Sequence, residues 1–254
     1  MKPIRVERVF VKEIENVRQG ENMMSGLASV DGEGRLGALT GIPGTGKTWW
    51  SQIHAANNDG VYFRVASIWK KSELDFIQAL CRELGMANPP GRKGRCYMEV
   101  VNRLIGTNRP VFVDEVQRLP KDFLLIVLDL SDATGCPIIL VGEPELRTMM
   151  QDHQRVWSRT FYALEFGPIT ELDLGFFSVK TSGMHLPPGV ISILHRASGG
   201  DLRIVRRDVI ALANLVNAKG PGPDGGPQIT EELARIAVKR GLSAGQNGNG
   251  KGKA

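Results

Sequence analysis

The apolar and polar positions of the first two thirds of the chain follow two periods in turn. Short apolar runs predict five strands, at residues 36–39, 61–65, 110–115, 137–141 and 162–166. Apolar residues spaced three or four apart predict helices between these runs, at residues 48–57, 72–84, 97–104 and from residue 123 onward. Strands that alternate with helices predict a three-layer α/β fold, in which helices cover both faces of a mainly parallel sheet of five strands.

The pattern changes at about residue 167, where the strand signals stop. Four helices are predicted, at residues 171–180, 189–197, 201–218 and 230–240, with Pro- and Gly-rich breaks at residues 186–189 and 220–227. Residues 243–254 are rich in Gly, Asn and Lys and have no apolar face, so they predict a disordered tail. We therefore expect a core over residues 1–167, a small helical appendage over residues 168–242 and a tail over residues 243–254.

Residues 41–48 carry the strongest chemical signal, a complete G-x-x-x-x-G-K-T phosphate-binding loop between a predicted strand and a predicted helix. Its members are Gly41, Ile42, Pro43, Gly44, Thr45, Gly46, Lys47 and Thr48. In such a loop the backbone N–H groups surround a polyphosphate, Lys47 reaches the β- and γ-phosphate oxygens, and the Thr48 hydroxyl binds Mg²⁺. The order of strand, loop and helix disfavours the alternative, a Gly-rich turn that matches by chance. The loop predicts a nucleoside triphosphate as the ligand.

Asp114 and Glu115 end the predicted strand at residues 110–115. These two carboxylates predict that the bound nucleotide is also hydrolysed. Because side chains alternate along a strand, Asp114 is expected to face the Mg²⁺ shell, while Glu115 polarises a water for attack on the γ-phosphate. The alternative is a buried strand whose Asp-Glu end is merely solvated. The phosphate-binding loop upstream disfavours that alternative.

The composition fits an intracellular nucleotide-dependent protein. With 254 residues and 42% hydrophobic content, the chain can bury a large core. Cys81, Cys96 and Cys136 lack metal-ligand spacing and cannot all pair, which is typical of the reducing cytosol. No apolar run is long enough to span a bilayer and the N-terminus lacks a signal-peptide core, so a cytoplasmic protein outside the membrane is expected. The formal net charge of +5 favours an anionic partner, although so small an excess is common in soluble proteins.

These motifs resemble the AAA+ ATPases, and among them the small transposition regulators of the MuB, TnsC and TniB type. The resemblance covers nearly the whole chain and rests on the phosphate-binding loop, on Asp114-Glu115 followed by Val-Gln-Arg-Leu, and on residues 139–146. It implies a core sheet in the strand order 5-1-4-3-2 followed by a helical lid. It also implies that ATP and Mg²⁺ are held between the subunits of a homo-oligomer, either a ring or a helical filament.

The resemblance assigns further roles outside the loop. Arg155 and Arg159 match the box from which a neighbouring subunit offers an arginine finger, with Arg159 as the first choice; the alternative is two surface arginines on a helix. Arg203, in the string Ser-Gly-Gly-Asp-Leu-Arg, is similar to the second sensor and is expected to reach the bound phosphates. Glu143 stands where the family places a polar Asn, Thr or Ser sensor, so the chain departs from the family pattern there.

The resemblance also points to DNA, although the sequence holds no base-reading motif, so contacts are expected to be to phosphates. The candidate cations at the starts of two consecutive helices are Lys70, Lys71, Arg92, Lys93 and Arg95. In family members, the corresponding positions line the inside of a helical filament. A row of cations repeated along such a filament would bind duplex DNA without sequence preference. The alternative is solvated loop charge. Trp49-Trp50 directly follows the phosphate-binding loop, which favours packing against the lid or a neighbouring subunit over stacking on bases.

Together these expectations describe an ATP-dependent AAA+ regulator of DNA transposition, encoded by a bacterium or a phage. It would oligomerise on duplex DNA and present target DNA to a transposase. Two alternatives stay open: an AAA+ switch of the secretion type that acts on protein partners without DNA, and a helicase or initiator loader. ATP-dependent binding to duplex DNA separates the first function from the protein switch, whereas the loader shares its chemistry and differs in its partner.

Overall fold

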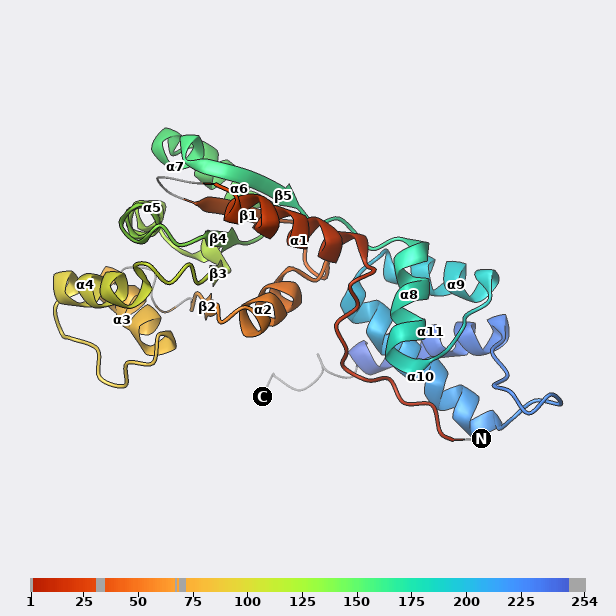
Figure 1. Ribbon diagram of the computed structural model, residues 1–254. Coiled ribbons are helices and arrows are strands. Elements are labelled where there is room, and N and C mark those ends of the chain that lie inside the picture. The colour runs from red at the N-terminus through yellow and green to blue at the C-terminus, as the bar shows by residue number, and fades with distance from the viewer. Residues whose placement is uncertain (1, 31–34, 67, 69–71, 247–254) are drawn as a thin grey trace, which may run out of the picture. The chain divides into compact units, whose positions relative to one another are not determined.

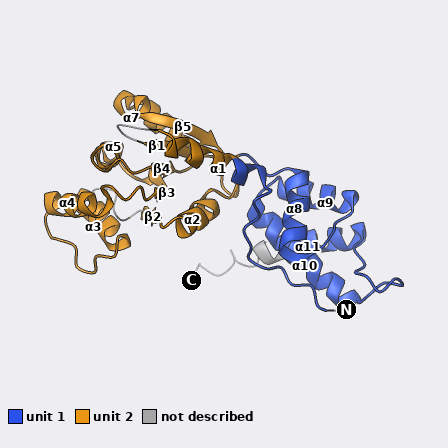
Figure 2. Cartoon of the chain, viewed as in Figure 1, with its two compact units in different colours: residues 1–18, 167–254 blue, residues 19–166 orange. Residues whose placement is uncertain are grey.

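The structure of the chain is a computed structural model that describes residues 2–30, 35–66, 68 and 72–246. It divides into two compact units (Figure 2). Residues 19–166 form the sheet unit, and residues 1–18 together with the chain from residue 167 onward form the helical unit. Within the described part of the chain, no helix is both long enough and apolar enough to cross a bilayer.

Five strands form the centre of the sheet unit (Figure 1): β1 (Leu36–Thr40), β2 (Val61–Arg64), β3 (Val111–Asp114), β4 (Ile138–Val141) and β5 (Thr160–Glu165). All neighbouring strands pair in parallel, in the order β2-β3-β4-β1-β5. This confirms the predicted parallel sheet and the strand order that the family resemblance implies. Because parallel strands end at the same edge, the loop after β1 and Asp114 at the end of β3 lie along one edge of the sheet.

One face of the sheet is covered by α2 (Lys47–Asn57) and by the part of α1 (Glu15–Ala28) from residue 19 onward. Gly37 of β1 lies beneath α1, since a Cβ there would meet Leu27 Cδ1 at 3.0 Å. Trp50 of α2 is fully buried, and its ring meets Phe112 of β3 edge-on, with 5.6 Å between the ring centroids. Its Nε1 donates to Glu21 of α1 at 3.0 Å. The expectation that Trp50 packs against the lid or a neighbouring subunit is wrong, because α1 and the sheet enclose it.

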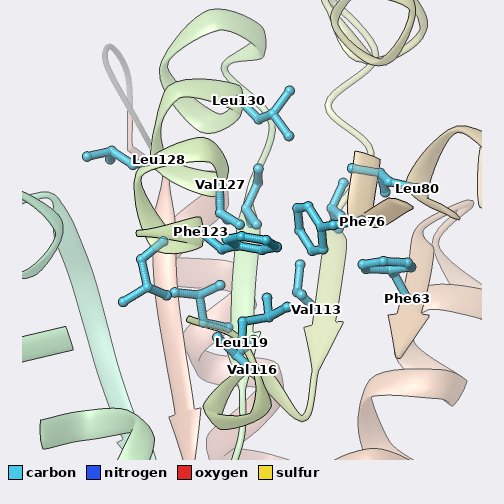
Figure 3. Close-up of a cluster of buried hydrophobic side chains, with 14 of the residues drawn as sticks. Phe63, Phe76, Leu80, Val113, Val116, Leu119, Phe123, Val127, Leu128 and Leu130 are labelled. Carbon is cyan, nitrogen blue, oxygen red and sulfur yellow. The ribbon is translucent and has the colours of Figure 1, made fainter. Parts of the chain in front are cut away.

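The other face carries the larger core. It is covered by the 3₁₀ helix η2 (Val116–Arg118) and by α3 (Glu73–Glu83), α4 (Lys93–Leu104), α5 (Phe123–Thr134), α6 (Pro144–Gln151) and α7 (Gln154–Ser158). Phe63 of β2, Phe76 of α3 and Phe123 of α5 contact one another in series, with ring centroids 5.3 and 5.6 Å apart (Figure 3). Val116 and Leu119, just beyond β3, are buried in the same cluster. They anchor the turn that follows Asp114, and the two covered faces complete the predicted three layers.

Three helices that lie wholly or partly in the sheet unit, α1, α6 and α7, are not indicated by the sequence pattern. In α1, Val17, Met24 and Leu27 have helical spacing, but Gly20 occupies the middle of the same face. A Cβ on Gly20 would lie 2.5 Å from Trp50 Cε2, so the indole fills the space where a side chain would have completed the pattern. Helices α6 and α7 have eight and five residues, too few to establish a period. Strand β5 begins two residues before the predicted start.

The helical unit confirms the predicted C-terminal helices. They are α8 (Glu171–Ser182), α9 (Pro188–Ser198), α10 (Leu202–Lys219) and α11 (Glu231–Gln246). Thr170 begins α8 in a capping box with Asp173, and the Asp201 side chain caps α10. Helix α11 continues to Gln246, past the predicted end of the appendage at residue 242. The rest of the predicted tail, residues 247–254, lies outside the described residues.

Residues 1–18 belong to this helical unit, although the sequence pattern places them with the core. The Glu7 N–H donates to the Thr181 carbonyl oxygen at 2.7 Å. Ile4 exchanges two hydrogen bonds with the Asn217 side chain, both at 2.9 Å. Thr181 and Asn217 are far from this segment in sequence, and they bond to its main-chain groups. No local pattern of apolar side chains therefore indicates these contacts.

Candidate nucleotide-binding site

The turn between β1 and α2 uses its glycines where the backbone requires them. Gly41 has φ 147°, and a Cβ there would lie 2.3 Å from the Phe166 carbonyl oxygen. Gly46, the N-cap residue of α2, has φ 94°. Both angles lie in the region that glycine adopts without strain. A side chain at Gly41 would clash with the Phe166 carbonyl oxygen, and one at either position would strain the backbone.

Lys47 is 8% exposed, and its ammonium is folded into the loop. Its Nζ donates to the Gly41 carbonyl oxygen at 2.5 Å and to the Ile42 carbonyl oxygen at 2.8 Å, and Thr45 Oγ1 lies at 3.5 Å. These acceptors are neutral, and phosphate oxygens at the same place would form stronger, charge-assisted hydrogen bonds. The N-terminus of α2 has no side-chain cap, so its first N–H groups can bind an anion. Loop, ammonium and helix end together fit a polyphosphate.

The loop and the sheet meet at Asp114, which is 2% exposed. Its Oδ2 accepts hydrogen bonds from the Thr48 hydroxyl at 2.8 Å and from the Tyr62 hydroxyl at 2.6 Å. Its Oδ1 accepts a hydrogen bond from the Glu115 backbone N–H at 2.9 Å. The structure thus brings together the two residues that the sequence assigns to the metal. A hydroxyl and a carboxylate are oxygen ligands of the kind that Mg²⁺ prefers, so both fit this ion.

Tyr62, on β2, is a site residue that the sequence pattern did not single out. Its strand pairs in register with β3, which places Tyr62 opposite Phe112 and its hydroxyl within reach of Asp114. Burial and the neighbouring Asp114 carboxylate raise the pKa of Tyr62 above its ordinary value, so the hydroxyl stays protonated as a donor. The only sequence signal is a polar-tipped aromatic residue in a short apolar strand.

Glu115 is not part of β3, because φ 63° and ψ 34° place it in a left-handed turn. The expectation that strand alternation aims its side chain is therefore wrong, and the turn sets its direction. The Glu115 carboxylate is 16% exposed. Its Oε1 accepts a hydrogen bond from Arg64 at 3.1 Å. Its Oε2 forms an ion pair with Arg118 at 3.0 Å and accepts a hydrogen bond from Gln117 at 3.1 Å. Since Oε1 has one of these partners and Oε2 has two, Oε1 keeps a lone pair for a water molecule.

The end of β4 carries a different polar group from the expected one. A Cβ on Gly142 would lie 2.5 Å from Gln117 Oε1, so the Gln117 amide lies against the end of this strand. Gln117 Oε1 is buried and has no hydrogen-bond partner among the described residues, while its Nε2 donates to Glu115. Glu143 begins α6 and is half-buried. Gln117 thus supplies an amide between Glu115 and the end of β4.

The two arginine-finger candidates lie on α7 and directly after it. Arg155 Nη2 is 3.5 Å from Asp129 Oδ1, and Arg159 Nη1 is 3.6 Å from Asp132 Oδ1. Both carboxylates belong to α5. These side chains are between 28% and 67% exposed, so the ion pairs are weak. The arginines are therefore surface residues within reach of a second molecule, and their catalytic role stays a prediction.

Arg203 lies in the first turn of α10, in the helical unit. Asp201 Oδ1 accepts hydrogen bonds from the backbone N–H groups of Arg203 at 2.7 Å and Ile204 at 3.3 Å. Gly199 ends α9 with φ 59°, and Gly200 has φ 78°. The predicted end of α9 at the glycines and the predicted start of α10 at Asp201 are both present. The contact between Arg203 and phosphates stays a prediction.

Three of the five candidate DNA-binding cations, Arg92, Lys93 and Arg95, are exposed at the N-terminus of α4. Lys93 forms an ion pair with Glu73 of α3. The first turn of α4 has no acidic residue, so the helix dipole adds to the positive charge of these side chains. The other two, Lys70 and Lys71, lie outside the described residues.

Comparison with known protein families matches the part of the chain that holds the phosphate-binding loop and the end of β3. Residues 30–150 match a family described as an AAA domain. This range includes Lys47, Thr48, Asp114 and Glu115, whereas Arg155, Arg159 and Arg203 lie beyond it.

Two curated relatives match about half of the chain. A Mu-like prophage FluMu DNA transposition protein B of Haemophilus influenzae is 28% identical over 131 residues, which cover 49% of this chain and 46% of that protein. The ATP-dependent target DNA activator B of Escherichia phage Mu is 28% identical over 120 residues, which cover 47% of this chain and 38% of that protein. The chain therefore spans less than half the length of the curated relatives it matches.

The fold is similar to that of a solved structure, Cdc6p from Pyrobaculum aerophilum. The TM-score is 0.67, at 16% sequence identity, over 92% of this chain and 69% of that chain. At this identity the likeness shows a shared α/β fold with a helical part after the sheet, and nothing about ligands.

Proposed function

We propose that this chain, which is a MuB-like AAA+ ATPase, uses ATP and Mg²⁺ to oligomerise on duplex DNA and presents that DNA to a transposase as a target. The observation that carries the nucleotide part is the contact between Thr48 and Asp114 beside the folded-in Lys47. The names of the relatives, which include DNA transposition and ATP-dependent target DNA activation, support the DNA part. Relatives from a phage and a prophage support a bacterial or phage origin and a place in the bacterial cytoplasm.

The residues of the site divide the reaction among them. The N–H groups of residues 41–48 bind the phosphates, and Lys47 exchanges its carbonyl partners for phosphate oxygens. Thr48 and Asp114 hold Mg²⁺, which when bound neutralises charge on the phosphates. Glu115 Oε1 accepts a hydrogen bond from the attacking water and orients it. Arg64, Arg118 and Gln117 keep that carboxylate in place.

A trans role for Arg159 is the part of this proposal that requires an oligomer. Arg159→Ala is expected to lose ATP hydrolysis that depends on assembly by on the order of 1000-fold, since an arginine finger stabilises charge only in the transition state. Nucleotide binding by the isolated subunit is expected to remain. ATPase rates measured against protein concentration check both results. Arg155→Ala, one helical turn away, is the matched variant and is expected to have a small effect.

Mixing two inactive variants distinguishes a trans role from a structural one. Lys47→Ala subunits keep Arg159, and Arg159→Ala subunits keep a complete phosphate-binding loop. At an interface formed by one of each, the site is complete, so the mixture is expected to regain part of the activity. No recovery at any ratio, with co-assembly shown by cross-linking, would reject Arg159 as the finger.

DNA binding is expected to depend on the cations at the start of α4. Replacing Arg92, Lys93 and Arg95 together by Ala should weaken ATP-dependent binding to duplexes of any sequence. The slope of log affinity against log salt is expected to fall by about 0.9 for each DNA phosphate that the variant no longer neutralises. Fluorescence anisotropy with labelled duplexes of two unrelated sequences, between low and moderate salt, measures both quantities.

A charge-matched variant separates a local contact from a general loss of positive charge. Arg82, Lys121 and Arg147 are exposed cations elsewhere on the sheet unit, and replacing all three by Ala removes the same charge. This control is expected to bind DNA nearly as well as the wild type. Equal losses in both variants would remove the α4 surface from the proposal. ATP hydrolysis by a wild-type protein that binds no DNA in any nucleotide state would instead indicate a switch that acts on protein partners.

A further inference from the structure

We propose that Tyr62 is a positioning residue for the divalent cation of the nucleotide site, and that it acts by holding the Asp114 carboxylate. The inference rests on the proposed nucleotide-binding function. It adds a residue from β2 to a site that the sequence motifs build only from the loop after β1 and from β3.

The Asp114 carboxylate is held by three donors from three different elements. The Thr48 hydroxyl comes from α2, the Tyr62 hydroxyl from β2 and the Glu115 N–H from the turn after β3. The Tyr62 contact is 2.6 Å long, the shortest of the three. Because Asp114 is 2% exposed, solvent does not replace a missing donor easily. The orientation of the carboxylate therefore depends on these three groups.

The three donors differ in what a bound cation does to them. The Thr48 hydroxyl is itself a proposed metal ligand, so its oxygen is shared between the ion and the contact with Asp114. The Glu115 N–H holds the opposite oxygen, Oδ1. Tyr62 is thus the donor that fixes Oδ2 without being assigned to the metal, and its hydroxyl retains lone pairs that can accept from water.

The fold fixes the phenol ring that carries this hydroxyl. Tyr62 lies opposite Phe112 in the parallel pairing of β2 with β3. Phe63, the next residue of β2, is buried in the aromatic cluster on the other face (Figure 3), so Tyr62 points toward the face covered by α2. The pairing of β2 with β3 therefore holds the hydroxyl toward Asp114.

Tyr62→Phe removes the hydroxyl and keeps the ring. Loss of a group that orients a metal ligand typically lowers metal affinity by about 10- to 100-fold. We therefore expect the Mg²⁺ concentration for half-maximal binding of a fluorescent, non-hydrolysable ATP analogue to rise by about 10-fold or more. Binding of the same analogue in EDTA is expected to stay at the wild-type level. A second readout, the electron paramagnetic resonance signal of free Mn²⁺ titrated into protein and analogue, should show the same loss.

Two matched variants and one double variant test the route through Asp114. Tyr162→Phe, on β5, and Gln52→Ala, at an exposed position of α2, are expected to have wild-type metal dependence. In the Asp114→Asn background, Tyr62→Phe is expected to cause little further change, since the carboxylate through which it acts is gone. Thermal unfolding of each variant shows that the fold is kept.

The outcomes separate this inference from the proposed function. If the wild type does not bind the analogue with or without Mg²⁺, the nucleotide site itself is rejected. If the wild type binds it in a Mg²⁺-dependent way and Tyr62→Phe is unchanged or binds the ion more tightly, only the role of Tyr62 is rejected. An equal loss of binding in EDTA and in Mg²⁺ would show that Tyr62 supports the fold of the loop and not the cation.

Discussion

Lys47→Ala is expected to abolish detectable ATP binding. The ammonium lies inside the loop between residues 41 and 48, and it would exchange its carbonyl partners for oxygens of two phosphates. One charge-assisted hydrogen bond is worth roughly 1.5–3 kcal/mol, so the loss of two lowers affinity by about 100-fold or more. Titration with a fluorescent ATP analogue in the presence of Mg²⁺ measures this change.

Lys121→Ala is the matched control for this result. Lys121 is an exposed lysine of the same unit and forms a surface ion pair with Asp152. Its removal takes away the same charge and is expected to leave nucleotide affinity within about threefold, because exposed ion pairs contribute little. Since Lys47 also holds carbonyl groups of the loop, thermal unfolding of both variants is needed. Tight ATP binding by a folded Lys47→Ala protein would contradict the phosphate-binding role of the loop.

The sequence predicts the central strands well because β1, β3 and β4 are buried along their whole length. Such strands are continuous apolar runs, and β3 and β4 lie within two residues of their predicted bounds. The first helix is different, because the Trp50 ring takes the place of a side chain at Gly20. That exchange between two elements leaves a gap in the apolar pattern of α1. Residues 1–18 are assigned to the wrong unit for a related reason, since their partners are distant main-chain and amide groups.

Some residues of the candidate site can also be predicted from the sequence, and others depend on contacts between elements. The phosphate-binding loop is a local motif, so its residues can be named from sequence spacing alone. Tyr62 and Arg64 reach Asp114 and Glu115 only because β2 pairs with β3 in the register that places Arg64 opposite Asp114. Knowledge of the strand neighbours is needed to predict these contacts. The direction of Glu115 depends on its left-handed turn, which the buried Val116 anchors and strand alternation does not describe.

Glu115→Gln is expected to keep ATP bound while turnover falls by about 100-fold or more, the usual contribution of a general base. The amide keeps the shape of the side chain and removes the charge that polarises water at Oε1. Its contacts with Arg64 and Arg118 lose their ionic part, but those guanidiniums are 54% and 42% exposed, so the unfolding temperature should change little. Single-turnover hydrolysis and analogue binding, measured on the same preparation, separate chemistry from affinity.

Two further variants show whether the effect belongs to the carboxylate at this position. Glu145→Gln, in the first turn of α6, neutralises an exposed carboxylate of the same unit and is expected to hydrolyse ATP at nearly the wild-type rate. Glu115→Asp keeps the charge but withdraws it by one methylene group, and an intermediate rate is expected because a water held by Oε1 would be misplaced. Hydrolysis by Glu115→Gln at the wild-type rate would mean that another group activates the water. Gln117, whose buried Oε1 lies against the end of β4, would then be the next residue to replace.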